Sequence, residues 1–158
     1  MNETPLSIPE AIVRLETLCA RGEHCTYELR QKLLQWGIPP FKHQDVIEHL
    51  MRKHFVDDRR FANACVRTKF NINGWGRAKI EIWLRSRHVE YDLIREALKT
   101  QIDPVDYKAK LQSMLSTKFN NLGGEMTFDV RQKLYRFALH KGFEVDVVMD
   151  VISKLAED

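Results

Sequence analysis

The chain has 158 residues, of which 44% are apolar and 30% charged, and its formal net charge is +3. This length suits one domain or a short array of small modules, and only 7 Gly and 5 Pro disfavour a turn-rich β protein. No apolar run approaches the roughly 20 residues that a membrane-spanning helix needs.

The N-terminal residues, MNETPLSIPE, lack the basic and then apolar order of a signal peptide. The three cysteines, Cys19, Cys25 and Cys65, are an odd number without a CxxC spacing. We therefore expect a cytoplasmic monomer whose thiols are reduced and form no disulfide. Residues 1–9 precede the first periodic segment and are predicted to form a flexible tail.

Apolar residues spaced by three and four recur along nearly the whole chain, as amphipathic helices require. They predict an all-α protein with nine short helices, which run through residues 11–19, 29–36, 46–50, 61–66, 80–84, 93–98, 111–115, 134–138 and 147–155. Ser7 to Glu10 has the pattern of a capping box, and Asp103 before Pro104 predicts another helix start. Gly22, Gly37 and Gly142 stand where helix ends favour a left-handed residue.

The helices align as three groups of three. The anchors of the alignment are Gly37-Ile38, His88-Val89 and Gly142-Phe143, which are 51 and 54 residues apart, and residues 39–42 (PPFK) are an insertion in the first group. Because a three-helix unit this small buries little surface alone, neighbouring units must share surface. We predict an elongated, curved array of three three-helix repeats over residues 10–56, 57–102 and 103–158.

The charge is unevenly distributed along this array. Residues 52–88 contain ten basic and three acidic side chains, a net charge of +7, whereas the remainder carries −4. This asymmetry predicts an acidic or polyanionic partner for the middle of the chain. A solvated basic face without a partner is the alternative interpretation.

The sequence FVDDRRFA, residues 55–62, places two acids beside two bases. The carboxylates could hold a metal, the arginines could hold a phosphate, or the stretch could join two helices. Asp57 or Asp58 can cap the helix that carries Phe61, which contributes about 1 kcal/mol and accounts for the acids without a metal. We therefore interpret the stretch as the joint between the first two repeats.

The basic side chains of the middle repeat are the candidate contact residues, because guanidinium and ammonium groups recognise phosphates and carboxylates. They are Arg59, Arg60, Arg67, Lys69, Arg77, Lys79, Arg85 and Arg87. Either Arg59 or Arg60 is expected to be partly structural, through an ion pair with a nearby aspartate. Glu81 could likewise pair with Arg77 and Arg85 at helical spacing.

Two interpretations of Trp75, which lies between Gly74 and Gly76, remain open. The ring could be a stacking platform for a nucleobase, or it could fill the junction between two repeats. Trp36 and Trp83 lie in helical register and are expected in the core. The six histidines have no metal-ligand spacing, and nucleophile motifs and phosphate-binding loops are missing. No catalytic, metal or cofactor site is predicted.

Three blocks of the sequence resemble the bacterial regulatory protein RecX family. They are residues 21–33 (RGEHCTYELRQKL), residues 55–70 (FVDDRRFANACVRTKF) followed by GWGRAKI at 74–80 and Leu84, and Lys133 to Phe137 followed by Lys141-Gly142-Phe143. The resemblance covers roughly residues 11–155. Three positions depart from the family pattern: Cys25 replaces a serine that caps a helix, His88 replaces a glycine, and Lys141 replaces an arginine.

The resemblance implies a non-enzymatic modulator, usually an inhibitor, of the RecA recombinase in homologous recombination, DNA repair and the SOS response. Family members are thought to lie in the groove of the RecA–DNA filament, where they block filament extension, ATP hydrolysis and strand exchange, and some bind DNA directly. The expected partners are therefore the RecA filament and single- or double-stranded DNA, through the eight basic residues named above. A free-standing DNA-binding module of helix-turn-helix type, acting without RecA, is the alternative.

Overall fold

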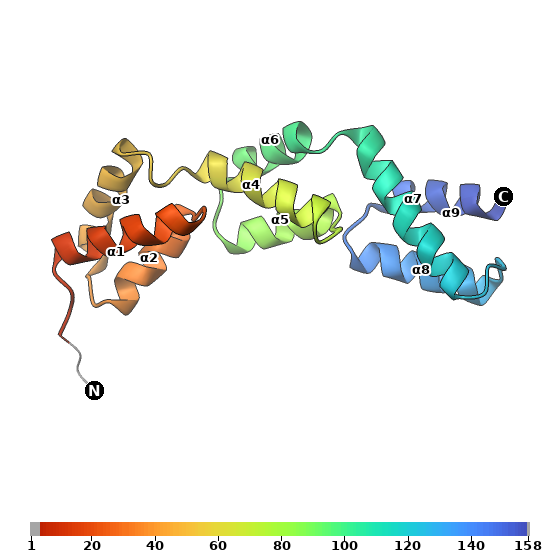
Figure 1. The fold of residues 1–158 in the computed structure, drawn as a ribbon, viewed down its shortest axis with the longest axis horizontal. Coiled ribbons are helices and arrows are strands. Elements are labelled where there is room, and N and C mark those ends of the chain that lie inside the picture. Colours follow the sequence, from red (N-terminus) through yellow and green to blue (C-terminus); the bar gives the residue numbers. More distant parts are fainter. Residues whose placement is uncertain (1–3, 158) are drawn as a thin grey trace.

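The computed structural model describes residues 4–157, and within this range it contains nine α-helices and no strand. The helices form an elongated row of three groups (Figure 1). Unit 1 comprises α1 (Ile8–Arg21), α2 (Thr26–Gln35), a short 3-10 turn (Pro40–Lys42) and α3 (His43–Arg52); unit 2 comprises α4 (Asp58–Asn71), α5 (Arg77–Ser86) and α6 (Tyr91–Gln101); and unit 3 comprises α7 (Pro104–Asn121), α8 (Phe128–His140) and α9 (Val145–Glu157). The prediction of an all-α protein is confirmed.

The buried apolar side chains form two cores rather than three. Unit 1 has its own core, which includes Leu15 and Leu33. Units 2 and 3 share one, in which Tyr107 of α7 stacks on Phe70 of α4 at 5.8 Å and contacts Phe143 at 4.9 Å between ring centroids. Units 2 and 3 are therefore joined by apolar burial. Unit 1 meets unit 2 through Cys25, which is buried in the same core, through the Tyr27 ring, which stacks on His88 at 4.0 Å between centroids, and through the polar contacts described below.

We propose that the three groups of helices correspond to the repeats 10–56, 57–102 and 103–158. The expected flexible tail needs correction, because α1 begins at Ile8 and the Leu6 N–H donates to the Trp36 carbonyl at 3.2 Å. Residues 4–9 are thus partly helical and partly fixed on the end of α2. The first three residues of the expected tail lie outside the described residues.

The same turn ends the second helix of every unit. Its central residues are Gly37, His88 and Gly142, with φ angles of 79°, 56° and 98°. The N–H of the following residue (Ile38, Val89 or Phe143) donates to the carbonyl five positions earlier, at 2.9, 3.3 and 3.2 Å. This is the hydrogen bond of a Schellman motif, and the apolar residue that donates it is buried in all three cases. We call these segments, residues 36–38, 87–89 and 141–143, the second-helix turns.

The predicted helix starts are confirmed at Ser7, whose hydroxyl accepts from the Glu10 N–H at 3.3 Å, and at Asp103, whose carboxylate accepts from the Val105 N–H at 2.8 Å. Gly22 was wrongly predicted to be left-handed. Its φ is 173°, which is extended backbone that any residue adopts.

The thiols of the described residues are free, and burial raises the pKa of Cys25 to about 12 and that of Cys65 to about 11. Only the thiolate is nucleophilic, so a raised pKa lowers the reactive fraction at pH 8. We expect iodoacetamide to modify Cys25 at least about 100-fold more slowly in the native protein than in urea, measured by mass spectrometry. Rapid modification of native Cys25 would contradict the closed joint between units 1 and 2.

Candidate interface on the middle unit

The same hydrogen bond is made at each of the three second-helix turns. The backbone carbonyl of the residue that ends the second helix of a unit accepts a hydrogen bond from a residue that precedes the first helix of that unit. Trp36 accepts from the Leu6 N–H at 3.2 Å, Arg87 from the Cys25 thiol at 3.6 Å, and Lys141 from the Gly76 N–H at 2.8 Å. The start of the second helix in one unit therefore docks on the second-helix turn of the next unit.

The two acids of FVDDRRFA have different partners. The Asp57 carboxylate caps its own helix, α4, and accepts from the Arg60 N–H at 3.1 Å. The Asp58 carboxylate instead reaches unit 1 and accepts from the Thr26 N–H at 2.8 Å and the Thr26 hydroxyl at 2.9 Å. Thr26 is the first residue of α2, so Asp58 satisfies one of the N–H groups that have no partner within the helix at its start. The interpretation of the stretch as a joint agrees with these contacts.

Arg60 and Arg59 are held by acids from other elements. Arg60 pairs with Glu23 at 2.7 Å and also donates to the carbonyl of His54 at 3.1 Å, which ties α4 to unit 1. Arg59 pairs with Glu96 of α6. We expected one of the two arginines to be structural, and both are. Neither pairs with Asp57 or Asp58, which were the predicted partners.

Arg77 belongs to the joint between units 2 and 3. Its guanidinium pairs with Glu144 at 2.8 Å and lies 3.9 Å from the ring centroid of Tyr107. The Tyr107 hydroxyl accepts from the Arg77 backbone N–H at 3.0 Å and donates to Glu144, and burial with this bond raises the pKa of Tyr107 above its usual range. The expected pairing of Arg77 with Glu81 is wrong because Glu144, from unit 3, takes its place.

Close approach of two backbones completes this joint. The N–H groups of Gly76 and Ala78 donate to the carbonyls of Lys141 and Gly142 at 2.8 and 3.0 Å. A Cβ on Gly76 would lie 2.4 Å from the Gly142 carbonyl carbon. The glycines that flank Trp75 therefore serve the joint, and the ring between them is partly buried against the core that units 2 and 3 share.

Trp75 lies in a row of alternating cations and aromatic rings on unit 2. The Lys79 ammonium is 4.5 Å from the Trp75 ring centroid, and the Lys69 ammonium is 4.7 Å from that ring and 4.9 Å from Trp83. The Arg87 guanidinium lies 4.7 Å from Trp83. We call Lys79, Trp75, Lys69, Trp83 and Arg87 the cation–aromatic row. All five side chains are half-buried. Trp83 packs against the core, as expected, but part of its side chain remains exposed.

Backbone geometry explains why these side chains meet. Lys79, Trp83 and Arg87 are four residues apart and so share one side of α5 and its C-terminal cap. Lys69 approaches from the last turns of α4, and the loop between the helices brings in Trp75. The other side of Trp83 packs on Phe61 at 6.0 Å between centroids, which anchors the row to the core.

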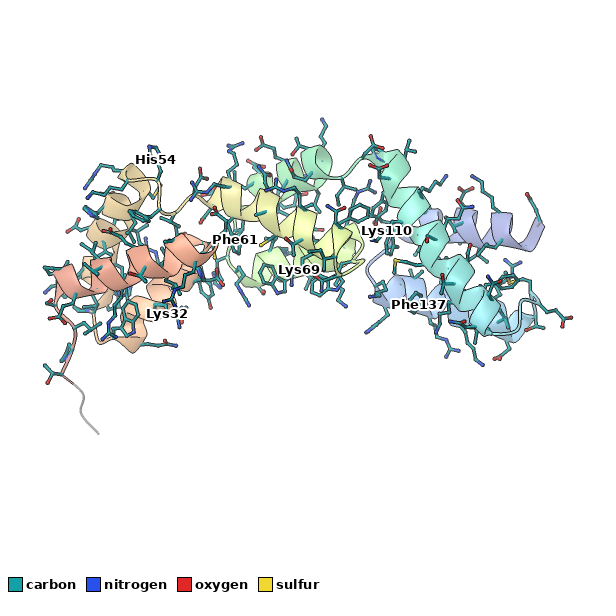
Figure 2. All side chains as sticks on the ribbon, in the orientation of Figure 1. Lys32, His54, Phe61, Lys69, Lys110 and Phe137 are labelled. Atoms are coloured by element: carbon teal, nitrogen blue, oxygen red, sulfur yellow. The ribbon has the colours of Figure 1, made fainter. Side chains whose placement is uncertain are left out.

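Two of the three cations in the row have no carboxylate partner in the described part of the chain. Lys69 and Lys79 form no ion pair among residues 4–157, and Arg87 has only Glu28, at 3.6 Å. An aromatic ring attracts a cation through its quadrupole without neutralising it, so such a cation can still bind an anion. Lys110 and Lys141 of unit 3 extend the basic surface. They donate to the carbonyls of Asn71, the last residue of α4, and of Asn73 in the loop that follows it; Lys69 and Lys110 are labelled in Figure 2.

The eight predicted contact residues are thus divided by the structure. Three of them, Arg59, Arg60 and Arg77, are committed to ion pairs within the chain. Arg67 donates to Gln101 of α6 at 2.7 Å, and Arg85 is exposed. Lys69, Lys79 and Arg87 come together in the row. Sequence reasoning missed the row, although the spacing of Lys79, Trp83 and Arg87 was a signal for it.

Other kinds of site are not seen in the described part of the chain. No group of three or more His, Cys, Asp or Glu side chains in residues 4–157 could hold a metal ion. No helix in this range combines the length and apolar character needed to cross a membrane.

Known proteins are similar to this chain in sequence and in fold. Residues 57–98 match the family model described as RecX, second three-helix domain. The regulatory protein RecX of Clostridium botulinum (strain Eklund 17B) is 31% identical over 80% of this chain, and the alignment spans 59% of that relative's length. The crystal structure of RecX from Lactobacillus salivarius superposes with a TM-score of 0.86 at 19% identity, covering 96% of this chain and 97% of that one, which shows the shared fold.

A second relative decides membership. The regulatory protein RecX of Pseudomonas syringae pv. tomato is 30% identical over 151 residues, which are 94% of this chain and 94% of the relative. The match therefore includes all three units rather than the middle one alone. From its sequence and its fold together, the chain belongs to the RecX family of regulatory proteins.

Proposed function

We propose that this protein is a non-enzymatic inhibitor of the RecA recombinase that binds along the RecA–DNA filament and slows its ATPase, extension and strand exchange. Family membership over 94% of the chain is the observation that supports this proposal. The elongated row of units suits a ligand that spans several filament subunits, and the charge of the middle segment suits the DNA or an acidic surface within the filament.

The test is ATP hydrolysis by RecA from the same organism on single-stranded DNA, with increasing amounts of this protein. We expect inhibition well below one molecule per RecA monomer, because one elongated molecule can block several subunits. Inhibition that needs enough protein to coat the DNA would contradict filament binding and favour competition for DNA.

A free-standing DNA-binding module is the second candidate, and the uncompensated charges of Lys69 and Lys79 favour it. The flanking segments weigh against it, since they carry a net charge of −4 while a dedicated duplex binder is basic throughout. Tight duplex binding without any effect on RecA would establish this alternative.

A further inference from the structure

We propose that the cleft between α8 and α9 is a docking site for an amphipathic helix of another protein, one that carries a carboxylate in its first turn. We call it the unit 3 cleft. All six residues that line it come from these two helices: Arg131, Gln132, Tyr135, Met149, Ile152 and Ser153. The inference goes beyond the proposed function and holds whether or not the protein inhibits RecA.

Unit 2 has an equivalent cleft between α5 and α6. Its volume is about 800 Å³, and two of the residues that line it, Pro104 and Glu144, belong to unit 3. Six others stand at the same distances along the chain from His88 as the residues of the unit 3 cleft stand from Gly142: Arg77, Ala78, Glu81, Arg95, Leu98 and Lys99. The unit 2 cleft is thus walled on one side by the first residue of α7 and by the residue before α9. Helix starts of a neighbouring unit therefore fit against this kind of cleft.

The unit 3 cleft is uncharged at positions where the unit 2 cleft is charged. Three charged side chains of unit 2 are replaced at equivalent positions: Glu81 by Tyr135, Arg95 by Met149 and Lys99 by Ser153. Unit 3 lies at the end of the described row (Figure 1), and an outermost repeat ordinarily has a polar outer face because no neighbour covers it. The loss of charge in this cleft therefore indicates a face that a partner covers.

Apolar surface extends from the cleft along both helices. Phe128 shares one side of α8 with Gln132 and Tyr135 and is 79% exposed, and Met149 of α9 is 57% exposed. Exposed apolar side chains that are bordered by polar ones mark an interaction surface. The cleft volume of about 230 Å³ is below the range of about 300–1,000 Å³ for small-molecule sites. It suits the apolar side chains of a helix that lies in the groove.

Arg131 sets the charge of the occupant. Its counterpart in unit 2, Arg77, pairs at 2.8 Å with Glu144, which directly precedes α9. Arg131 is exposed and has no carboxylate partner within residues 4–157. A carboxylate in the first turn of a partner helix would take the place of Glu144, because a guanidinium binds it strongly and the helix dipole favours an acid at that end.

A second copy of this chain does not fit in the same way. The residue that directly precedes the third helix is an acid in units 2 and 3, Glu90 and Glu144, but it is Lys42 in unit 1. Unit 1 of a second molecule, docked as the next unit of the row, would bring this lysine toward Arg131, and like charges across an interface repel. The occupant is therefore a different protein.

The experiment follows binding of a synthetic helix by NMR of protein with isotope-labelled methionine methyl groups. The probe has about 20 alanine-rich residues, enough to form a helix, with leucines at i, i+3, i+4 and i+7 and two glutamates in its first turn. We expect the Met149 signal, assigned with Met149→Leu, to shift during the titration. The Met51 signal should stay unchanged, although Met51 lines a cleft between units 1 and 2.

Fluorescence anisotropy of the labelled probe then separates charge from apolar contact. Arg131→Glu should weaken binding at least about tenfold, the loss expected for one charge-assisted hydrogen bond, and should strengthen binding of a second probe with lysines in place of the glutamates. Met149→Gln should weaken binding at least about fivefold. The matched controls, Arg136→Glu and Met51→Gln, make the same changes at exposed positions that do not line the unit 3 cleft and should bind as wild type. Melting curves confirm that each variant is folded.

Several results would overturn the site. Equal binding of the two probes, or unchanged binding by the folded Arg131→Glu variant, would show that the carboxylate plays no part. An unshifted Met149 signal at millimolar probe would show that the cleft takes no helix. Dimerisation in analytical ultracentrifugation that Met149→Gln abolishes would assign the cleft to a second copy. Binding of anionic lipid vesicles in place of the helix would assign it to a membrane surface.

Discussion

Gly76→Ala is expected to lower the free energy of unfolding by about 2–3 kcal/mol, as overpacking of a close contact does. The φ of Gly76 is −78°, which every residue can adopt, so the requirement for glycine is spatial. The added Cβ would lie 2.4 Å from the carbonyl carbon of Gly142 and 2.5 Å from the Phe143 nitrogen. Both atoms belong to backbone inside the second-helix turn, so neither can move aside as a flexible side chain would.

Urea unfolding followed by far-ultraviolet circular dichroism measures this effect. Gly22→Ala is the matched control, because nothing lies within 4 Å of the position of its Cβ and its backbone is extended. Its stability should stay within about 0.5 kcal/mol of wild type. Equal stability of the two variants would show that units 2 and 3 do not approach each other as closely as described.

Asp58→Ala is expected to release unit 1 from unit 2. The carboxylate accepts two hydrogen bonds from Thr26, and hydrogen bonds to charged groups contribute about 1.5–3 kcal/mol each. Because unit 1 has its own core, we expect it to open locally while units 2 and 3 remain folded. Hydrogen exchange of α1 to α3, measured by mass spectrometry, should accelerate by at least about 100-fold, whereas exchange of α8 should not change.

Asp57→Ala serves as the control for this prediction, since it removes the same charge one residue away. It deletes only the cap of α4 and should cost about 1 kcal/mol without selective opening of unit 1. The same exchange pattern in both variants would mean that the joint depends on local charge rather than on the Asp58–Thr26 bonds.

Much of the architecture could be predicted from spacing alone, because apolar periodicity reports helices and their shared faces. Gly37 and Gly142 were predictable as left-handed residues because they follow the ends of these helices. The alignment of His88 with them identified a third left-handed residue. Gly22 shows the limit, since a glycine after a helix does not reveal whether its φ is positive. Its φ is 173°, although it follows α1 as Gly142 follows α8.

The candidate site was less predictable. The basic composition of the middle repeat pointed to the segment that contains the row. Whether each basic side chain forms an ion pair, however, depends on residues that are far away in the sequence. Arg77 pairs with Glu144, 67 residues later, and Arg60 pairs with Glu23, 37 residues earlier. Only tertiary contacts show that these arginines form ion pairs, whereas Lys69 and Lys79 form none among the described residues.

The docking of one unit's helix start on the next unit's second-helix turn is a head-to-tail contact. Between separate molecules, a contact of this heterologous type propagates into open fibres unless the series is terminated. In this chain the first acceptor is already occupied, because Leu6 donates to the Trp36 carbonyl and Pro5 packs over Gly37. A second molecule would have to displace this segment before it could add. Pro5 and Leu6 therefore occupy, within the molecule, the surface that a head-to-tail contact between two molecules would need.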